Sequence, residues 1–419
     1  MDGRRLRICL LTYRGNPTCG GQGIYIKKIG RALRDLGHAV EVVSGPPYPE
    51  LAEGITLWKV PSLDLYNPND LFRIPSLGEL SSPVNALEWL SVSTGGFPEP
   101  FTFGLRALRF FRGLPSRSYD IVHDNQCLSY GLLGIRRLGY PLVATIHHPI
   151  TFDRDAEIRS AGKWWKRLKV RRWYSFYGMQ TRVSRRIPHI ITVSERSKLD
   201  IASAFGIPSG RIRVVPNGID TDIFHPLPHL KREKNRIIVT NSADMPLKGL
   251  RYLLEAVASI VKKRDVRLTV IGTPKKNGEI ERLVRELRLG RHLEFTGRIE
   301  DQDFPYYYAT STLAVVSSLY EGFGFPAGEA MACGTPVVST TGGALPEVVG
   351  DAGVLVPPAD ARALEKAILY LLDHPEKRRA LSRAGLRRVQ EHFTWNRTAE
   401  GLVSAYREAM HVDGGLFQA

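Results

Sequence analysis

The chain has 419 residues, enough for two domains that each bury a hydrophobic core. Its hydrophobic content of 43% and charged content of 24% are typical of a globular protein. No apolar run approaches the length of a bilayer span, and the basic start (residues 4–7) precedes an apolar stretch too short for a signal peptide. Four widely spaced cysteines without a Cys-x-x-Cys pair argue against a disulfide framework or zinc site. We therefore expect a cytoplasmic protein.

The net charge of +16 is unevenly distributed. Residues 1–216 carry +14 and the remainder +2. Positions 158–194 hold ten basic residues and no acidic one. The positive charge is a local feature, and it needs a local explanation.

Apolar, β-branched runs alternate with helical patterns along the chain, which predicts an α/β fold with parallel sheets covered by helices. In the first half the expected strands are 6–12, 39–44, 121–123, 142–146, 190–193 and 213–215. In the second half they are 237–240, 268–271, 293–296, 313–316, 336–339 and 353–356.

Two segments interrupt this alternation. Residues 216–232 turn to Pro, Asn, Gly and His, which places a boundary between an N-terminal domain (1–216) and a C-terminal domain (217–393). Residues 61–118 combine Pro, Ser and Asn with clustered aromatic residues, and we expect an ordered, packed insert on the acceptor side.

The first expected strand leads into the glycine turn Gly20-Gly21-Gln22-Gly23 and a helix over 24–36. Such a turn binds anions in many α/β proteins, although a tight turn required only for packing remains an alternative. His147 and His148 follow the strand 142–146, at the strand end where α/β sheets bind ligands. Either histidine could instead be purely structural.

Lys248 and Gly249 open a helix after the strand 237–240. A lysine at this place is a compact cation suited to neutralise a diphosphate. Asp301-Gln-Asp303 looks like a metal-binding Asp-x-Asp, but it fits a helix-capping role better, and we expect no metal site.

The stretch Glu321–Glu329, Glu-Gly-Phe-Gly-Phe-Pro-Ala-Gly-Glu, is the most informative part of the sequence. Two carboxylates flank a glycine-rich loop whose backbone N–H groups can approach a ligand closely, and a helix start follows. Pro326 suits a first helical turn, and we expect Glu329 in that turn. Carboxylates beside an anion-binding loop suit a ligand with hydroxyls and phosphates, such as a nucleotide sugar.

This stretch and the run that follows it to Pro336 resemble the Glu-x7-Glu signature of retaining GT-B glycosyltransferases, especially family 4. The resemblance covers nearly the whole chain and is strongest over 214–356. It implies a GT-B fold, two Rossmann-like parallel-sheet domains facing a central cleft, with a final segment (394–419) that returns to the N-terminal domain. It also implies a nucleotide-sugar donor, a sugar, lipid or small-molecule acceptor, and no cofactor or essential metal.

The resemblance assigns site roles by position. The catalytic candidates are His147, Lys248 and Glu321. The donor-binding candidates are Gly21, Gly23, Asn241, Ser242, Ile299, Gly322, Phe323, Gly324, Phe325 and Glu329. Within these, Glu321 lies beside the sugar hydroxyls and Glu329 binds the ribose.

One departure from the family pattern concerns the phosphates. The family usually has an arginine five or six residues before the lysine, where this chain has Ser242 or Ala243. Either Lys248 acts alone, or a residue such as Arg14, Lys275 or Arg298 supplies the second cation.

The basic block 163–174 mixes Trp and Tyr with six cations and has a partly helical apolar spacing. This composition is typical of an interfacial helix on anionic lipid, and we expect residues 163–172 to dock at the inner face of the membrane. A solvated basic face and nonspecific nucleic-acid contact are the alternatives; we expect no nucleic-acid partner.

Two rival functions remain open at this point. A nicotinamide-dependent oxidoreductase is disfavoured because the glycine turn lacks Gly-x-Gly-x-x-Gly and no acidic residue ends the second strand. A noncatalytic GT-B relic that binds membranes or partners is suggested by the missing arginine and the basic block. The leading prediction is a retaining glycosyltransferase whose acceptor is lipid-linked or at the membrane surface.

Overall fold

The computed structural model describes residues 4–16, 21–67, 70, 73–240 and 245–416. Contacts divide the chain into two compact units. Unit 1 comprises Met1–Val193, Ser197–Val215 and Thr398–Ala419, and unit 2 comprises Ser194–Arg196 and Pro216–Arg397. Among the described residues, no helix combines the length and apolar character needed to cross a bilayer.

Unit 1 is built on a parallel seven-stranded sheet with the order β3-β2-β1-β4-β5-β6-β7. Its strands are β1 (Arg7–Thr12), β2 (Ala39–Ser44), β3 (Thr56–Lys59), β4 (Ile121–Asn125), β5 (Leu142–Thr145), β6 (His189–Thr192) and β7 (Ile212–Val214). The sequence predicted every strand except β3. That edge strand is mostly exposed, so it lacks the buried apolar run that marks the others.

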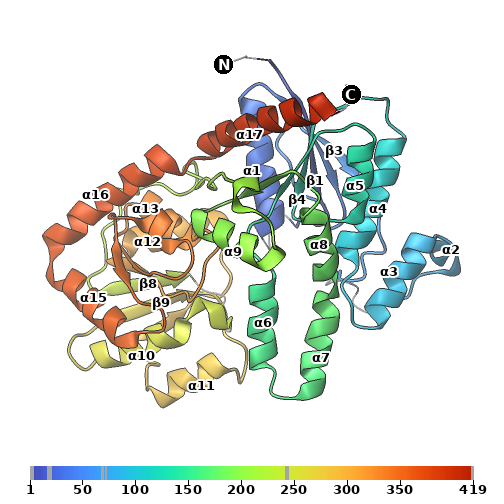
Figure 1. Ribbon diagram of the computed structural model, residues 1–419. Helices are drawn as coiled ribbons and strands as arrows, with labels where there is room; N and C mark the ends of the chain where they lie inside the picture. The colour runs from blue at the N-terminus through green and yellow to red at the C-terminus, as the bar shows by residue number, and fades with distance from the viewer. Residues whose placement is uncertain (1–3, 17–20, 68–69, 71–72, 241–244, 417–419) are drawn as a thin grey trace. The chain divides into compact units, whose positions relative to one another are not determined.

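Unit 1 also contains helices that pack beside this sheet and others that project away from it (Figure 1). They are α1 (Gly21–Asp35), α2 (Leu77–Leu80), α3 (Pro83–Ser93), α4 (Glu99–Arg112), α5 (Tyr130–Arg137), α6 (Thr151–Ser160), α7 (Trp164–Trp173), α8 (Tyr177–Ser184), most of α9 (Glu195–Phe205) and most of α17 (Trp395–Leu416), with short 3-10 turns at Tyr174–Phe176 and Ser209–Arg211. The core packs β4 and β5 against α4, α5 and α8 through side chains such as Val122, Phe111 and Val183.

The irregular segment 61–118 is only partly an insert. Its last third contains α4, a regular crossover helix whose Phe103 and Phe111 are buried in the core. The aromatic residues of this helix therefore reflect core packing, whereas Phe97, before the helix, packs against Tyr66 and Trp173. The expectation of an insert over the whole segment is wrong for residues 99–112.

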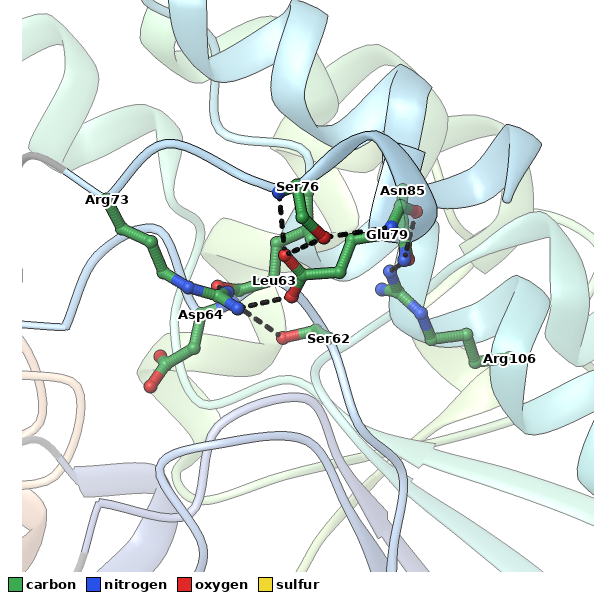
Figure 2. Close-up of polar contacts among 8 residues, drawn as sticks. All are labelled: Ser62, Leu63, Asp64, Arg73, Ser76, Glu79, Asn85 and Arg106. Carbon is green, nitrogen blue, oxygen red and sulfur yellow. Dashed lines mark hydrogen bonds and ion pairs between the residues drawn. The ribbon is translucent and has the colours of Figure 1, made fainter. Parts of the chain in front are cut away.

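The remainder, with α2 and α3, is held by polar contacts (Figure 2). Ser76 and Glu79 form a reciprocal capping box, in which the Ser76 amide donates to Glu79 Oε2 at 2.9 Å. The Arg73 guanidinium pairs with Glu79 and donates to the Leu63 carbonyl. These groups satisfy one another's hydrogen-bonding capacity. The segment is therefore ordered without a large apolar core of its own.

The C-terminal part of α17 belongs to unit 1, where Tyr406 is fully buried. Its hydroxyl lies 2.6 Å from Nδ1 of His123 on β4, and Nε2 of His123 lies 2.7 Å from Oγ1 of Thr145 on β5. Burial lowers the pKa of His123 to about 3, so the ring is neutral and each nitrogen needs one partner.

Unit 2 has a parallel six-stranded sheet with the order β10-β9-β8-β11-β12-β13. Its strands are β8 (Arg236–Thr240), β9 (Arg267–Ile271), β10 (Leu293–Phe295), β11 (Leu313–Val316), β12 (Val337–Thr340) and β13 (Val354–Val356). Its helices are α10 (Leu250–Ile260), α11 (Glu279–Glu286), α12 (Phe304–Thr310), α13 (Phe325–Ala332), α14 (Leu345–Val349), α15 (Ala361–Asp373) and α16 (Pro375–His392), with 3-10 turns at Pro246–Lys248 and Asp301–Asp303. The sequence predicted all six strands, because each contains apolar residues between helical patterns, and β8, β9, β11 and β12 are largely buried.

We predict that Tyr406→Phe lowers the free energy of unfolding of unit 1 by about 1–3 kcal/mol, because a buried imidazole nitrogen loses its partner. Chemical denaturation followed by circular dichroism measures this change. Tyr130→Phe is the control, since that hydroxyl accepts a 3.4 Å bond from the exposed Arg182. Equal stability of the two variants would contradict the assigned role of Tyr406.

Candidate active-site residues

Both sheets have the strand order of a doubly wound nucleotide-binding fold. In this fold successive parallel strands are added first on one side of the first strand and then on its other side, and the place where the side changes is the switch point. In unit 2 this switch point lies between β8 and β11, and in unit 1 between β1 and β4. Ligands of such folds bind outside the carboxyl ends of the strands at the switch point. The predicted residues follow these strands or their neighbours.

In unit 2, Lys248 and Glu321 come together. Nζ of Lys248, in the segment after β8, lies 2.8 Å from Oε1 of Glu321, in the segment after β11. The hydroxyl of Ser318 donates to the same oxygen at 2.7 Å. The Glu321 side chain is 12% exposed, so the pair is shielded from water, and its attraction is stronger than that of a surface pair.

Close backbone approach holds these two segments together. The Leu319 amide donates to the Leu247 carbonyl at 2.7 Å, and Ser317 Oγ donates to the Lys248 carbonyl at 3.1 Å. A Cβ at Gly249, whose φ is +64°, would lie 2.1 Å from the Ser317 carbonyl oxygen. Glycine is therefore required between Lys248 and α10.

The helix after the glycine-rich loop differs slightly from the prediction. Gly324 is its N-cap, with φ of 111°, and Pro326 lies in the first turn as expected. Helix α13 begins at Phe325, so Glu329 is its fifth residue and lies beyond the first turn, contrary to the prediction. The helix begins earlier along the chain than that prediction requires, so the glycine-rich loop before it is shorter.

Glu329 is held by a buried tyrosine. The hydroxyl of Tyr308 on α12 donates to Glu329 Oε2 at 3.4 Å and also lies 2.9 Å from Thr240 Oγ1. Burial raises the pKa of Glu329 to about 7. Its carboxyl group therefore changes charge near neutral pH, where ligand hydroxyls can favour the ionised form.

The other donor-binding candidates of unit 2 differ in exposure. Gly322 and Phe325 are partly exposed and follow Glu321 directly, as predicted, and Ile299 is partly exposed in the loop after β10. Phe323 is buried and packs its ring edge-on against Phe325, so its side chain is structural. Asn241 and Ser242 lie outside the described residues.

Two further expectations concern charge. Arg14 is one of the proposed substitutes for the arginine that this chain lacks before Lys248. It forms an ion pair within unit 1, with 3.4 Å between its Nε and Oε2 of Glu99. Asp303 occupies the N-cap of α12, as predicted, although its side chain makes no capping hydrogen bond. The described residues contain no cluster of His, Cys, Asp and Glu that could hold a metal ion.

In unit 1, His147 follows β5 and is fixed on several sides. Its Nε2 lies 2.9 Å from Oδ1 of Asn125, and its amide donates to Oε1 of Gln126 at 2.8 Å. The Tyr25 ring packs edge-on against the imidazole, with 4.7 Å between centroids. Burial, and secondarily His148, lower the pKa of His147 to about 3, so the ring is neutral at physiological pH.

The remaining candidates of unit 1 lie at the same end of the sheet. Gly21 begins α1, and a Cβ at Gly23 would lie 2.1 Å from the Asn16 carbonyl oxygen. Gly23 is thus required for packing, whether or not it also meets a ligand. Nε2 of His148 lies 2.7 Å from Oδ2 of Asp153 on α6, and this contact gives His148 a structural role.

Sequence reasoning missed four polar residues that support the candidates: Asn125, Gln126, Tyr308 and Ser318. The signal for the first two was present, because His123-Asp-Asn-Gln126 follows a buried strand. We ended that strand at residue 123, whereas β4 continues to Asn125. No comparable pattern marks Tyr308, whose role arises from a tertiary contact, or Ser318, which lies three residues before Glu321 in the same loop.

Comparisons with known proteins identify the family. The model described as Glycosyltransferase Family 4 matches residues 19–223, and that described as Glycosyl transferases group 1 matches residues 224–388. The MMP alpha-(1->4)-mannosyltransferase of Mycolicibacterium hassiacum is 47% identical over 97% of this chain and 98% of its own. This chain is a family 4, group 1 glycosyltransferase.

More distant similarities agree with this assignment. The D-inositol 3-phosphate glycosyltransferase of Saccharomonospora viridis is 28% identical over 94% of this chain and 91% of its own. Sucrose-phosphate synthase of Thermosynechococcus elongatus matches with a TM-score of 0.72 and 25% identity, over 97% of this chain and 100% of its own. The GT-B fold predicted for this glycosyltransferase is confirmed, and the oxidoreductase and noncatalytic alternatives are set aside.

We predict that Gly249→Ala in this glycosyltransferase costs about 1–3 kcal/mol of folding stability, because the added Cβ meets a carbonyl oxygen at a positive φ. Thermal unfolding measures the change. Gly290→Ala is the matched control, since nothing lies within 4 Å of a Cβ there and it is also in unit 2. If both variants melt alike, the close approach does not constrain the Lys248 segment.

Proposed function

We propose that this glycosyltransferase moves a mannosyl group from a nucleotide-diphosphate mannose to a sugar hydroxyl, forming an α-(1→4) bond with retention of configuration. The pairing of Lys248 with Glu321 at the switch point of unit 2 is the observation that carries the proposal. The choice of mannose and of the α-(1→4) bond rests on the name of the relative that is 47% identical.

Charge changes along the reaction assign a task to each residue. As the bond from sugar to phosphate breaks, the sugar ring becomes positive and the leaving diphosphate becomes negative. Lys248 and the N–H groups of the loop before α13 stabilise the diphosphate. Glu321 lies beside the sugar, Glu329 binds the ribose hydroxyls and His147 contacts a hydroxyl of the transferred sugar.

Retention follows from attack on the face that the leaving group vacates. The acceptor oxygen forms a bond to the anomeric carbon, the bond from that carbon to the phosphate oxygen breaks, and the leaving phosphate takes the acceptor proton. This course requires neither a covalent sugar–enzyme intermediate nor a metal. It places the main electrostatic demand on Lys248.

We predict that Glu321→Gln and Lys248→Met each reduce kcat/KM by about 10²–10³, because each removes a charge that acts at the reacting centre. Purified protein is incubated with UDP-, GDP- and ADP-linked mannose and glucose, with and without a mannooligosaccharide acceptor. Nucleotide release and product linkage are then measured.

Glu365→Gln and Lys263→Met are the matched controls. Their side chains also form an ion pair in unit 2, at 2.7 Å, with an exposed lysine. These variants should keep full activity. If none of the donors binds or is consumed, the proposed reaction is contradicted. If a glucose donor is preferred, only the choice of mannose is contradicted, and the transfer reaction stands.

We also propose that the acceptor is lipid-linked or lies at an anionic membrane surface, to which residues 163–172 dock. Helix α7 forms as predicted, and none of its residues is buried. Trp164 and Leu168 are 77% and 58% exposed, which is unusual for large apolar side chains. An open groove of about 1160 Å³ lies between this helix and the end of α3.

The charges around these apolar side chains complement anionic lipid. Lys166, Arg167 and Lys169 lie within the same helix. Glu157, which also lines the groove, accepts a hydrogen bond from the Tyr174 hydroxyl at 2.8 Å. Exposed tryptophans beside lysines and arginines are typical of surfaces that insert at the level of lipid headgroups.

We predict that the protein pellets with vesicles containing phosphatidylglycerol and remains in the supernatant with phosphatidylcholine alone. The double variant Trp164→Ser/Leu168→Ser should reduce pelleting several-fold, because it removes the apolar side-chain area that would insert into the lipid. Leu199→Ser, at an exposed leucine on α9, is the control. The absence of lipid-dependent pelleting would refute membrane docking and leave a solvated basic face.

A further inference from the structure

A short chain of hydrogen bonds determines which nitrogen of His147 carries its proton. The chain begins at the carbonyl oxygen of Gln22, in the first turn of α1, which lies 3.2 Å from Nδ2 of Asn125 at the end of β4. A carbonyl oxygen can only accept a hydrogen bond. The amide nitrogen of Asn125 must therefore point toward Gln22, and this fixes the orientation of the Asn125 side chain.

The opposite end of the same amide faces the imidazole. Oδ1 of Asn125 lies 2.9 Å from Nε2 of His147, and an amide oxygen also can only accept. Nε2 therefore carries the proton. In a neutral imidazole the other nitrogen, Nδ1, is then a lone-pair acceptor.

The surroundings leave Nδ1 available. The ring is immobilised by the edge of Tyr25 and by the bond from the His147 amide to Gln126. Within the part of the chain that the structure describes, Nδ1 of His147 has no hydrogen-bond partner. His147 as a whole is only partly buried, so a ligand can approach it.

We propose that Asn125 is a positioning residue that holds His147 in its Nε2–H tautomer, so that Nδ1 accepts a hydrogen bond from a hydroxyl of the transferred sugar. The inference rests on the proposed function for the identity of the ligand, but the tautomer itself is a property of the unliganded protein. The first turn of α1 has a role of its own in this arrangement, because Gln22 supplies the carbonyl that orients Asn125.

The first test observes the tautomer directly. Nitrogen-15 histidine-labelled protein is studied by long-range proton–nitrogen correlation NMR at pH 7, and His147→Gln identifies the signal. The wild type should show an Nε2-protonated ring. Asn125→Leu, which is close in shape but cannot accept, should lose this single tautomer, and an unchanged His147 signal in that variant would overturn the proposal.

The second test uses charge. Asn125→Asp keeps an acceptor at the same place, so the tautomer should persist, but the carboxylate should raise the His147 pKa by about 1–3 units. Below the raised pKa the ring is protonated and Nδ1 becomes a donor. The activity of Asn125→Asp should therefore fall as the pH decreases through about 6 to 4, whereas wild-type His147, with its pKa of about 3, should add no such decrease.

Other ionisable groups lie around His147, and their effects must be separated from its own. They are His148 on the same loop, His123 and Asp124 on β4, Tyr25 on α1 and Asp153 on α6. Their contributions are common to wild type and variant, so the difference between the two profiles isolates His147. Asn85→Asp, which adds the same charge beside Arg106 in unit 1, is the control and should leave the profile unchanged.

The outcomes distinguish this inference from the proposed function. Asn125→Leu should lower kcat about tenfold or more through misorientation of the ring, with nucleotide affinity unchanged. A pH profile of Asn125→Asp identical to that of wild type would overturn the positioning role. A fixed tautomer in a protein that transfers no sugar would retain the inference about Asn125 and refute the proposed reaction.

Discussion

The order of the strands in the two parallel sheets is the constraint on which the candidate site depends. In each sheet the chain leaves its first strand on one side and returns on the other, so the segments after the first and fourth strands diverge. The helices that follow those strands cannot cover this point. It is therefore where backbone amides, Lys248 and Glu321 in one unit, and Asn125 with the start of α1 in the other, can meet a ligand.

Glycine residues near the switch points allow neighbouring segments of the backbone to approach one another closely. At Gly249 and Gly23 the backbone of one segment approaches the carbonyl of another more closely than any Cβ would allow. The result in unit 2 is a short, shielded ion pair between Lys248 and Glu321. A ligand phosphate that attracts Lys248 must compete with Glu321, so binding and the orientation of the carboxylate are linked through one cation.

Burial shifts the pKa values of polar groups near these strand ends. His123 and His147 are neutral, and Glu329 changes charge near pH 7. A neutral imidazole has one donor and one acceptor, and neighbouring groups decide which nitrogen is which. In unit 1 the main-chain carbonyl of Gln22 orients the Asn125 side chain, and Asn125 in turn determines which nitrogen of His147 carries the proton.

The sequence by itself determined the strands other than the exposed edge strand β3, because apolar runs separated by helical patterns are visible without any structure. It also determined the Glu321–Glu329 loop and Lys248, since glycine-rich turns and charged residues after such strands have a recognisable spacing. The tertiary structure alone decided that Glu329 lies beyond the first turn of α13, that Tyr308 holds it, and that Asn125 orients His147. The last two relations join residues from different elements, and a local pattern carries no information about which distant group will become a hydrogen-bond partner.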